Sequence, residues 1–147
     1  MKVKTLTKRF ISLILSMIMI FSFCGYFPMK KIVAEAATSV SPGIYIIEFR
    51  SGKVLDVTDE SINNGTQLQI WQRYEDHSNQ KFKIEKSGSY WKITAMNSNK
   101  VIEVRDSSKQ DYAQVAQWSD SNIACQRWEI ESDGSFVRFK NANSGMY

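Results

Sequence analysis

One unit of sequence occurs twice in this chain, and that repetition constrains the fold more than any other feature. The segment KVLDV at residues 53–57 returns 47 positions later as KVIEV, and Trp71 returns at the same spacing as Trp118. QKFKI at residues 80–84 returns 46 positions later as QRWEI. A repeat of this length is one supersecondary unit that cannot bury its apolar face alone. We therefore expect the chain to fold by packing copies of this unit against one another.

Each copy is predicted to form four β-strands. Short apolar or alternating runs are separated by clusters of Ser, Asn, Asp and Gly, which is typical of an all-β domain with many hairpins. The expected strands cover residues 43–49, 53–57, 67–71 and 81–85 in the first copy and 90–95, 100–104, 113–118 and 126–131 in the second. A third copy opens with SFVRFK and continues to NANSGMY. The predicted units are residues 43–85, residues 86–132 and a partial third at residues 133–147.

The N-terminus is predicted to be an export signal. Four cations within the first nine residues precede an uncharged, largely apolar run of 14 residues at positions 10–23. The AEA motif further along has the small-x-small pattern that signal peptidase recognises. We expect a helical signal peptide over residues 1–37, cleaved near Ala36 or Ala37, then a short linker over residues 38–42 and a secreted mature protein.

Two alternatives to a cleaved signal are less favoured. The apolar run is short for a membrane span, which needs ~20 residues, so a retained signal anchor is the first of them. A lipoprotein would be cut at Cys24, but Phe23 directly before it is too bulky for such a site. With the signal removed, no membrane partner is expected.

The basic character of the chain belongs to the predicted signal. The full chain has 19 Lys and Arg against 15 Asp and Glu, but six of the basic residues and one of the acidic residues precede the cleavage site, which leaves 13 against 14. No basic stripe remains that would bind phosphates without sequence preference, so nucleic acid is excluded as a partner.

Catalytic and metal chemistry are not expected within this chain. His77 is the only histidine, so neither a multi-histidine metal site nor a nucleophile–His–acid arrangement can be composed. Cys125 is the one cysteine of the predicted mature part, so no intrachain disulfide is expected there. A glycosidase needs only two carboxylates, but the acidic residues fall mostly in predicted surface turns. No catalytic residue, metal ligand or cofactor is therefore predicted.

The Gln-x-aromatic tripeptides near the end of each copy carry a family resemblance. They are Gln80-Lys81-Phe82 and Gln126-Arg127-Trp128. Together with the KVLDV and KVIEV strands and the internal period, they make residues 41–147 resemble the ricin-type (QxW) β-trefoil lectin domain. The resemblance implies a ricin B-like β-trefoil in which the copies meet around a pseudo-threefold axis. It also implies that Phe82 and Trp128 are core residues.

The resemblance implies a sugar-binding pocket in the first copy. The family uses an acidic residue after the apolar pair of the second strand, an aromatic platform, a Gln shortly before that platform, and an Asn-Gln pair before the core aromatic. The first copy has all five: Asp56, Gln69, Trp71, Asn79 and Gln80. A carboxylate accepts hydrogen bonds from adjacent hydroxyls, an amide both donates and accepts, and an indole face stacks on the apolar side of a pyranose.

Several of these residues also have a purely structural interpretation. Trp71 ends a strand and is alternatively a core residue, and Asp56 is alternatively a turn former. Gln80 is expected to hydrogen-bond within the fold whether or not sugar binds. Tyr74 and His77 lie in the flanking loop as auxiliary contacts, although a solvated position is favoured for His77. The functional interpretation is preferred because all five positions are filled together in one copy.

The second copy is predicted to hold a degenerate site. It keeps Trp118 and Gln126, but Glu103 replaces the aspartate and is one methylene longer. Ala116 and Cys125 replace the glutamine and the asparagine, which removes hydrogen bonds worth ~1 kcal/mol each. We expect the second site to be weak or inactive.

These features favour a secreted, non-enzymatic carbohydrate-binding module for galactose-type or xylan-type glycans. One alternative is the N-terminal targeting part of a larger secreted glycoside hydrolase or toxin, whose catalytic domain would lie beyond residue 147. Another is a trefoil that contacts proteins and binds no sugar. Fold alone does not separate these functions.

The third unit is incomplete against the period of the repeat. A full copy would need roughly 35 further residues after Tyr147. The expectation is therefore either a longer protein, with a catalytic domain as a possible partner, or self-association that completes the barrel.

Overall fold

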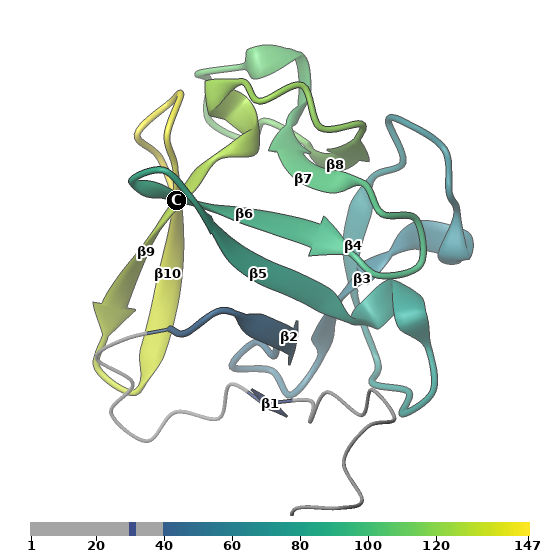
Figure 1. The fold of residues 1–147 in the computed structure, drawn as a ribbon. Coiled ribbons are helices and arrows are strands. Elements are labelled where there is room, and N and C mark those ends of the chain that lie inside the picture. Colours follow the sequence, from purple (N-terminus) through teal and green to yellow (C-terminus); the bar gives the residue numbers. More distant parts are fainter. Residues whose placement is uncertain (1–29, 32–39) are drawn as a thin grey trace, which may run out of the picture.

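The computed structural model describes residues 30–31 and 40–147, and in this part of the chain β-strands are joined by turns and single turns of 3-10 helix (Figure 1). The first repeat contributes β2 (Gly43–Ile46), β3 (Val54–Val57), β4 (Leu68–Trp71) and β5 (Phe82–Ser87). The second contributes β6 (Tyr90–Ala95), β7 (Val101–Val104), β8 (Val115–Trp118) and β9 (Trp128–Asp133). β10 (Phe136–Asn141) opens the third, and β1 (Lys30–Lys31) pairs with β2.

The all-β fold predicted from the sequence is confirmed, with two four-stranded repeats and the first strand of a third. The 3-10 turns occupy matching places in the two repeats. They are η2 (Thr58–Glu60), η3 (Ser78–Gln80), η4 (Arg105–Ser107) and η5 (Ala124–Gln126). Several strand boundaries differ from the expectation by one to three residues. β2 ends at Ile46, and the backbone turns after Phe49, where Gly52 N–H donates to the Phe49 carbonyl. β9 begins at Trp128 because the 3-10 turn η5 includes Gln126.

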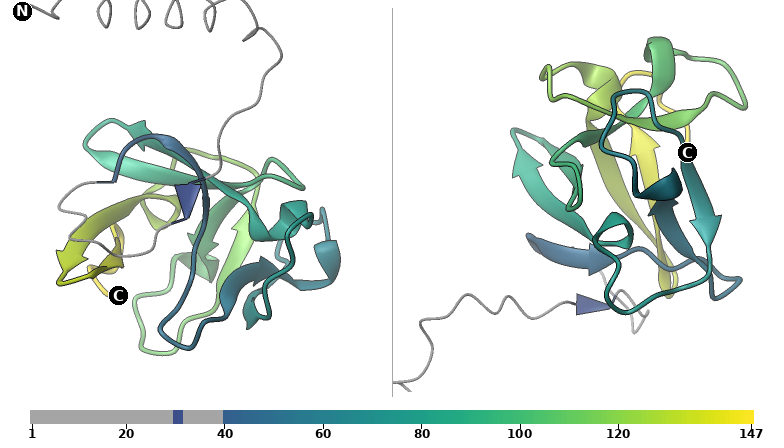
Figure 2. Two further views of the ribbon diagram at one scale, coloured as in Figure 1. Left: turned by 90° about the horizontal axis from the view of Figure 1, so that it is seen from below. Right: turned by 90° about the vertical axis from the view of Figure 1, so that its right-hand side faces the viewer.

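Hairpins connect successive repeats as well as strands within one repeat. β5 pairs with β6 across a two-residue turn at Gly88, and β9 pairs with β10 across the corresponding turn at Gly134. A bridge between Trp91 and Trp128 joins these two hairpins. The hairpins β3–β4 and β7–β8 lie at the right and the top of Figure 1, and Figure 2 shows the same arrangement from two other directions.

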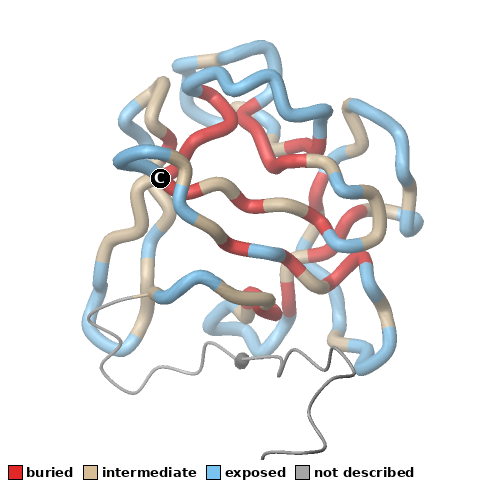
Figure 3. Tube along the Cα trace, viewed as in Figure 1, coloured by how far each residue is buried: buried red, intermediate tan, exposed pale blue. Residues whose placement is uncertain are grey.

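The core lies where the inward faces of these hairpins meet (Figure 3). Alternation along the strands turns every second side chain inward, so Phe82 and Ile84 of β5 and Val57 of β3 are fully buried. Trp128 is also buried, and its indole N–H donates to the Ile102 carbonyl at 3.0 Å, which satisfies the one polar group of the ring. Phe82 and Trp128 are the aromatics of the two Gln-x-aromatic tripeptides.

A buried glutamine joins the first repeat to the second. The side-chain amide of Gln117, in β8, donates to the carbonyls of Ser61 and Asn63 at 2.8 and 3.0 Å. Its Oε1 accepts from Ser98 Oγ at 2.7 Å. These bonds fix the loop that follows η2 against β8, and Gly65 in that loop donates its N–H to the Gln117 carbonyl at 2.8 Å.

The expected signal-peptide helix lies outside the described residues, apart from the two residues of β1. Within the described part of the chain, no helix is long and apolar enough to cross a membrane.

Gly65 generates a stability prediction. Its φ is +80°, and a Cβ built there would lie 3.1 Å from Cζ3 of Trp118. We expect Gly65→Ala to lower the free energy of unfolding by about 2 kcal/mol, through backbone strain and overpacking together. Gly88→Ala is the matched control, because Gly88 has a φ of +63° with nothing near its Cβ, and should cost only about 1 kcal/mol. Equal costs in urea denaturation would contradict the close approach to Trp118.

Candidate functional site

The hairpin β3–β4 places three of the five predicted site residues on one face. Asp56 pairs with Gln69, and Val54 pairs with Trp71. Residues two apart in a strand share a face, so Asp56, Gln69 and Trp71 all project to the same side of the hairpin. Asp56 is only 4% exposed, whereas Trp71 is 47% exposed. The hairpin therefore joins a sheltered carboxylate to an open aromatic surface.

The 3-10 turn η3 brings the other two predicted residues to the same carboxylate. Gln69 Nε2 donates to Asp56 Oδ1 at 2.9 Å. Asn79 Nδ2 and Gln80 Nε2 each donate to Asp56 Oδ2, also at 2.9 Å. An ionised carboxylate has about four acceptor positions, so three amides leave one of them, on Oδ1, for another donor.

Gln80 serves the fold as much as the carboxylate. Its side chain is fully buried, and its Nε2 also donates to the Gln72 carbonyl at 2.9 Å. Its Oε1 accepts the backbone N–H of Tyr74 at 2.8 Å. Gln80 therefore ties the loop after β4 to the Asp56 carboxylate and presents no surface to a ligand.

Asn79 differs from Gln80 in having spare acceptor capacity. Its Nδ2 donates to the Val57 carbonyl at 3.0 Å as well as to Asp56. Its Oδ1 is buried and accepts no hydrogen bond from the described residues. A buried amide oxygen without a donor is unusual in a native protein and marks a polar site with unfilled capacity.

Tyr74 and His77 lie beside the cluster and contact each other. Their ring centroids are 4.6 Å apart with the planes inclined at 30°. His77 Nδ1 lies 2.9 Å from Glu60 Oε1, and Gln72 Nε2 donates to the Tyr74 hydroxyl. Both rings therefore belong to a partly exposed loop, which contacts with Glu60 and Gln72 hold in place.

The second repeat has the structural glutamine, Gln126, but has Ala116 and Cys125 where the first repeat has the other two amides. Gln126 Nε2 donates to Glu103 Oε2 at 2.8 Å and to the Ser119 carbonyl at 2.9 Å. Its Oε1 accepts from the Ser121 backbone N–H at 2.8 Å, as in the first repeat. Glu103 pairs with Ala116 in the sheet, so the partner that Gln69 supplies to Asp56 is missing.

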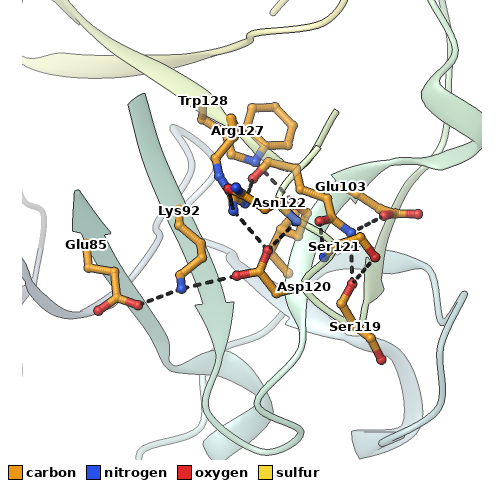
Figure 4. Close-up of polar contacts among 11 residues, drawn as sticks. Glu85, Lys92, Glu103, Ser119, Asp120, Ser121, Asn122, Arg127 and Trp128 are labelled. Atoms are coloured by element: carbon orange, nitrogen blue, oxygen red, sulfur yellow. Dashed lines mark hydrogen bonds and ion pairs between the residues drawn. The ribbon is translucent and has the colours of Figure 1, made fainter. Parts of the chain in front are cut away.

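The same region holds an ion-pair network that the sequence analysis did not find (Figure 4). Arg127 Nη2 donates to Asp120 Oδ1 at 2.9 Å and to Asn122 Oδ1 at 2.7 Å. Lys92 Nζ lies 3.2 Å from both Asp120 Oδ2 and Glu85 Oε1. Arg127 occupies the variable position of its Gln-x-aromatic tripeptide, so no pattern in the sequence marks it as buried.

The network shifts the pKa values of Asp120 and Lys92 in the directions that favour their charged forms. Partial burial opposes ionisation of Asp120, but hydrogen bonds from Arg127, the Asn122 backbone and Lys92 together lower the pKa of this carboxyl. Partial burial likewise works against the charged form of Lys92, but Glu85 and Asp120 together raise its pKa. The network therefore stabilises the loop between β8 and η5 in its ionised form.

The two repeats thus offer different chemistry. The first combines a pre-positioned carboxylate, a spare amide oxygen and an exposed indole face, which suits a neutral ligand with hydroxyl groups and an apolar face. The second has a carboxylate held by one amide and a Trp118 that packs on Gly65. Among the described residues, His, Cys, Asp and Glu side chains form no group of three that could hold a metal ion.

Comparisons with known proteins identify the fold. The family model described as ricin-type β-trefoil lectin domain-like matches residues 33–118 and 78–147. The structure is similar to ThreeFoil, a designed threefold symmetric protein, at 28% identity and a TM-score of 0.65, over 71% of this chain and 74% of that one. These matches confirm the β-trefoil.

Larger proteins contain a similar domain. An exo-β-1,3-galactanase from Clostridium thermocellum matches at 26% identity and a TM-score of 0.63, over 71% of this chain and 22% of the galactanase. A mosquitocidal holotoxin shares the fold at 18% identity and a TM-score of 0.64, over 73% of this chain and 13% of the toxin. This chain therefore spans a small part of each of these two proteins. The search of curated proteins found no match.

The ion-pair network generates a pH-dependent prediction. Because the folded-state pKa of Asp120 is lowered, its contribution to stability is complete above the ordinary value near 3.8 and is lost as the pH falls through the lower folded value. We expect Asp120→Asn to cost about 1 kcal/mol at pH 7 and the difference from the parent to shrink below about pH 4. The measurement is urea denaturation at several pH values.

Asp106→Asn is the control, because Asp106 is largely exposed and pairs only with its neighbour Arg105. It should leave stability unchanged within about 0.5 kcal/mol. A cost for Asp120→Asn that does not vary with pH would count against the charge network.

Proposed function

Since the chain belongs to the ricin-type β-trefoil lectin domain-like family, we propose that it is a carbohydrate-binding module whose first repeat holds the sugar. The observation that carries this proposal is the Asp56 carboxylate, held by three amides on the same face as the exposed Trp71 ring. Holding the carboxylate in advance lowers the cost of ordering it when a ligand binds.

The chemistry of the site points to a pyranose. The free acceptor position on Asp56 Oδ1 receives a sugar hydroxyl, and Asn79 acts by holding Asp56 Oδ2. The Trp71 ring stacks on the apolar C–H face of the sugar, with Tyr74 and His77 at the edge of the site. Gln69 and Gln80 act by fixing Asp56. Galactose-type and xylan-type glycans are the candidate ligands, and the similarity to a β-1,3-galactanase makes galactose-type glycans the first to test.

The second repeat contributes little to binding in this proposal. Glu103 is held by Gln126 alone, and Ala116 and Cys125 are buried where the first repeat has amides. A carboxylate held by one hydrogen-bond partner is less well ordered, so more conformational entropy is lost when a ligand binds to it. One good site makes a weak binder, and useful avidity then requires several modules together.

A second role is a targeting module within a larger secreted enzyme. It is favoured by the match to the galactanase, of which this chain spans 22%. In that role the trefoil binds the glycan and another domain performs the chemistry. The two roles share the same sugar site, so the binding experiment below tests them together.

Replacing the aromatic platform tests the sugar site. We expect Trp71→Ala to weaken binding to immobilised galactans or xylans by at least about tenfold, because stacking on an indole supplies more than about 1 kcal/mol. Tyr112→Ala is the control, since Tyr112 is a fully exposed aromatic of the second repeat and lies outside the site. Both variants should keep the parent Tm, and equal glycan binding by Trp71→Ala and the parent would refute the site.

Export is a further part of the proposal, resting on the charged and apolar pattern of the N-terminus. Expression of the full chain in a bacterial host should place the protein in the medium or periplasm, with a mature N-terminus near Ala37 or Thr38. N-terminal sequencing or intact mass measurement identifies the cleavage position. Recovery of the uncleaved chain in the membrane fraction would favour a signal anchor instead.

A further inference from the structure

Glu60 and His77 join the two 3-10 turns of the first repeat. His77 Nδ1 lies 2.9 Å from Glu60 Oε1. Glu60 is the last residue of η2, which directly follows β3, and His77 immediately precedes η3. β3 carries Asp56, and η3 carries two of the amides that hold its carboxylate, those of Asn79 and Gln80. The pair therefore bridges the two segments whose relative position sets the geometry of the proposed sugar site.

The pair also anchors the loop of residues 72–77, which lies beside the site. The His77 ring packs on the Tyr74 ring, with the centroids 4.6 Å apart. The Tyr74 N–H donates to Gln80 Oε1 at 2.8 Å, and the Gln80 amide in turn donates to the Asp56 carboxylate. Movement of the loop at Tyr74 would therefore disturb the amide that orders Asp56. An anchor on His77 limits that movement.

The Glu60 end of the pair starts from a backbone that the second repeat holds in place. Asn97 Nδ2 donates to the carbonyls of Glu60 and Ser61 at 3.1 and 3.0 Å. Asp59 and Glu60 both have positive φ, of 56° and 52°, which is uncommon for residues other than glycine. These constraints fix the direction in which the Glu60 side chain leaves the backbone. The carboxylate therefore offers His77 a fixed partner.

The second repeat has the same backbone at this place but lacks the pair. Ser107 ends η4 as Glu60 ends η2, and its φ is 51°. Ile123 precedes η5 as His77 precedes η3. Neither serine nor isoleucine is charged, so the two positions form no ion pair. The pair therefore accompanies the repeat whose carboxylate has three amide partners, and the turn itself forms without it.

The pair is too exposed to add much to the stability of the whole domain. The side chains of Glu60 and His77 are 59% and 42% exposed, so water and salt screen the attraction between them. Its effect should therefore appear in the local order of the loop and in ligand binding, with little change in Tm.

We propose that Glu60 is a positioning residue for the sugar site and acts through His77. Glu60 supplies the acceptor that fixes the His77 ring, and the fixed ring holds the loop of residues 72–77 against η3. Gln80 then keeps the Asp56 carboxylate ordered before the sugar arrives, which lowers the entropy lost on binding. This role rests on the proposed sugar site, because it concerns the same carboxylate.

Substitutions at residue 60 separate this role from a general effect on stability. We expect Glu60→Ala to weaken binding to immobilised galactans or xylans by about fivefold, because the loop must then be ordered on binding. Glu60→Gln should bind within about twofold of the parent, since its amide oxygen is also an acceptor. Ser107→Ala is the matched control, because Ser107 is exposed and ends the equivalent turn of the second repeat. It should bind as the parent does, and all three variants should keep Tm within about 2 °C.

A double variant tests whether Glu60 acts through His77. Glu60→Ala combined with His77→Ala should bind no more weakly than His77→Ala alone, because the first substitution has nothing further to release. Losses that multiply fully in the double variant would overturn the coupling, and so would equal losses in Glu60→Gln and Glu60→Ala.

Hydrogen exchange follows the loop without any ligand. Glu60→Ala should speed exchange of the Tyr74 amide, which is bonded to Gln80, by about fivefold, and Ser107→Ala should leave its rate unchanged. Unchanged exchange or unchanged binding in Glu60→Ala would overturn the positioning role. If Trp71→Ala loses binding while Glu60→Ala binds as the parent does, this role alone fails. If Trp71→Ala also binds as the parent does, the sugar site itself is refuted.

Discussion

The hydrogen bonds of the buried Gln-x-aromatic glutamine are the interaction on which the rest of this structure depends. In each repeat the glutamine donates to an acidic side chain and to a loop carbonyl, and it accepts a loop N–H. Burying this amide costs little because all of its hydrogen bonds are made. Removing the amide would leave a buried carboxylate or backbone group without a hydrogen-bond partner. The same side chain therefore fixes the loop after the second hairpin and the carboxylate on that hairpin. Fold and site share one residue, which explains why Gln80 and Gln126 are retained while their surroundings differ.

The two repeats share one scaffold but differ in the groups that hold its carboxylate. Asp56 has two additional amide partners, from Gln69 and Asn79. Glu103 lacks both, and its neighbourhood has instead gained the Arg127 network, which stabilises the adjacent loop through charge. The second repeat thus combines a carboxylate held by one amide with a loop held by ion pairs.

The repeat period and the strand pattern predicted most of the fold, because alternating apolar residues and turn-forming clusters are local features. The register of Asp56 opposite Gln69 follows from the same pattern, so their proximity was also predictable. The sequence did not reveal that the three amides donate hydrogen bonds to the Asp56 carboxylate. These bonds depend on the packing of η3 against β3, which the local sequence pattern does not specify. Nor did it reveal that Arg127 is buried or that Ile70 is exposed, because those depend on contacts between repeats. Tyr112, at the position of Gly65, adopts a φ of +62° that its residue type does not suggest.

The hairpins β5–β6 and β9–β10 have a consequence for how this protein folds and diversifies. Each joins the last strand of one sequence repeat to the first strand of the next, so the sequence period and the folding unit are out of phase. Tight hairpins form within microseconds, which makes the junctions between repeats natural starting points for folding, ahead of the distant contacts through Gln117. A copy of one sequence repeat would therefore contain one complete hairpin, equivalent to β3–β4 or β7–β8, but only one strand of each hairpin that joins the repeats. The hairpins that join the repeats therefore form only when successive repeats are linked in one chain.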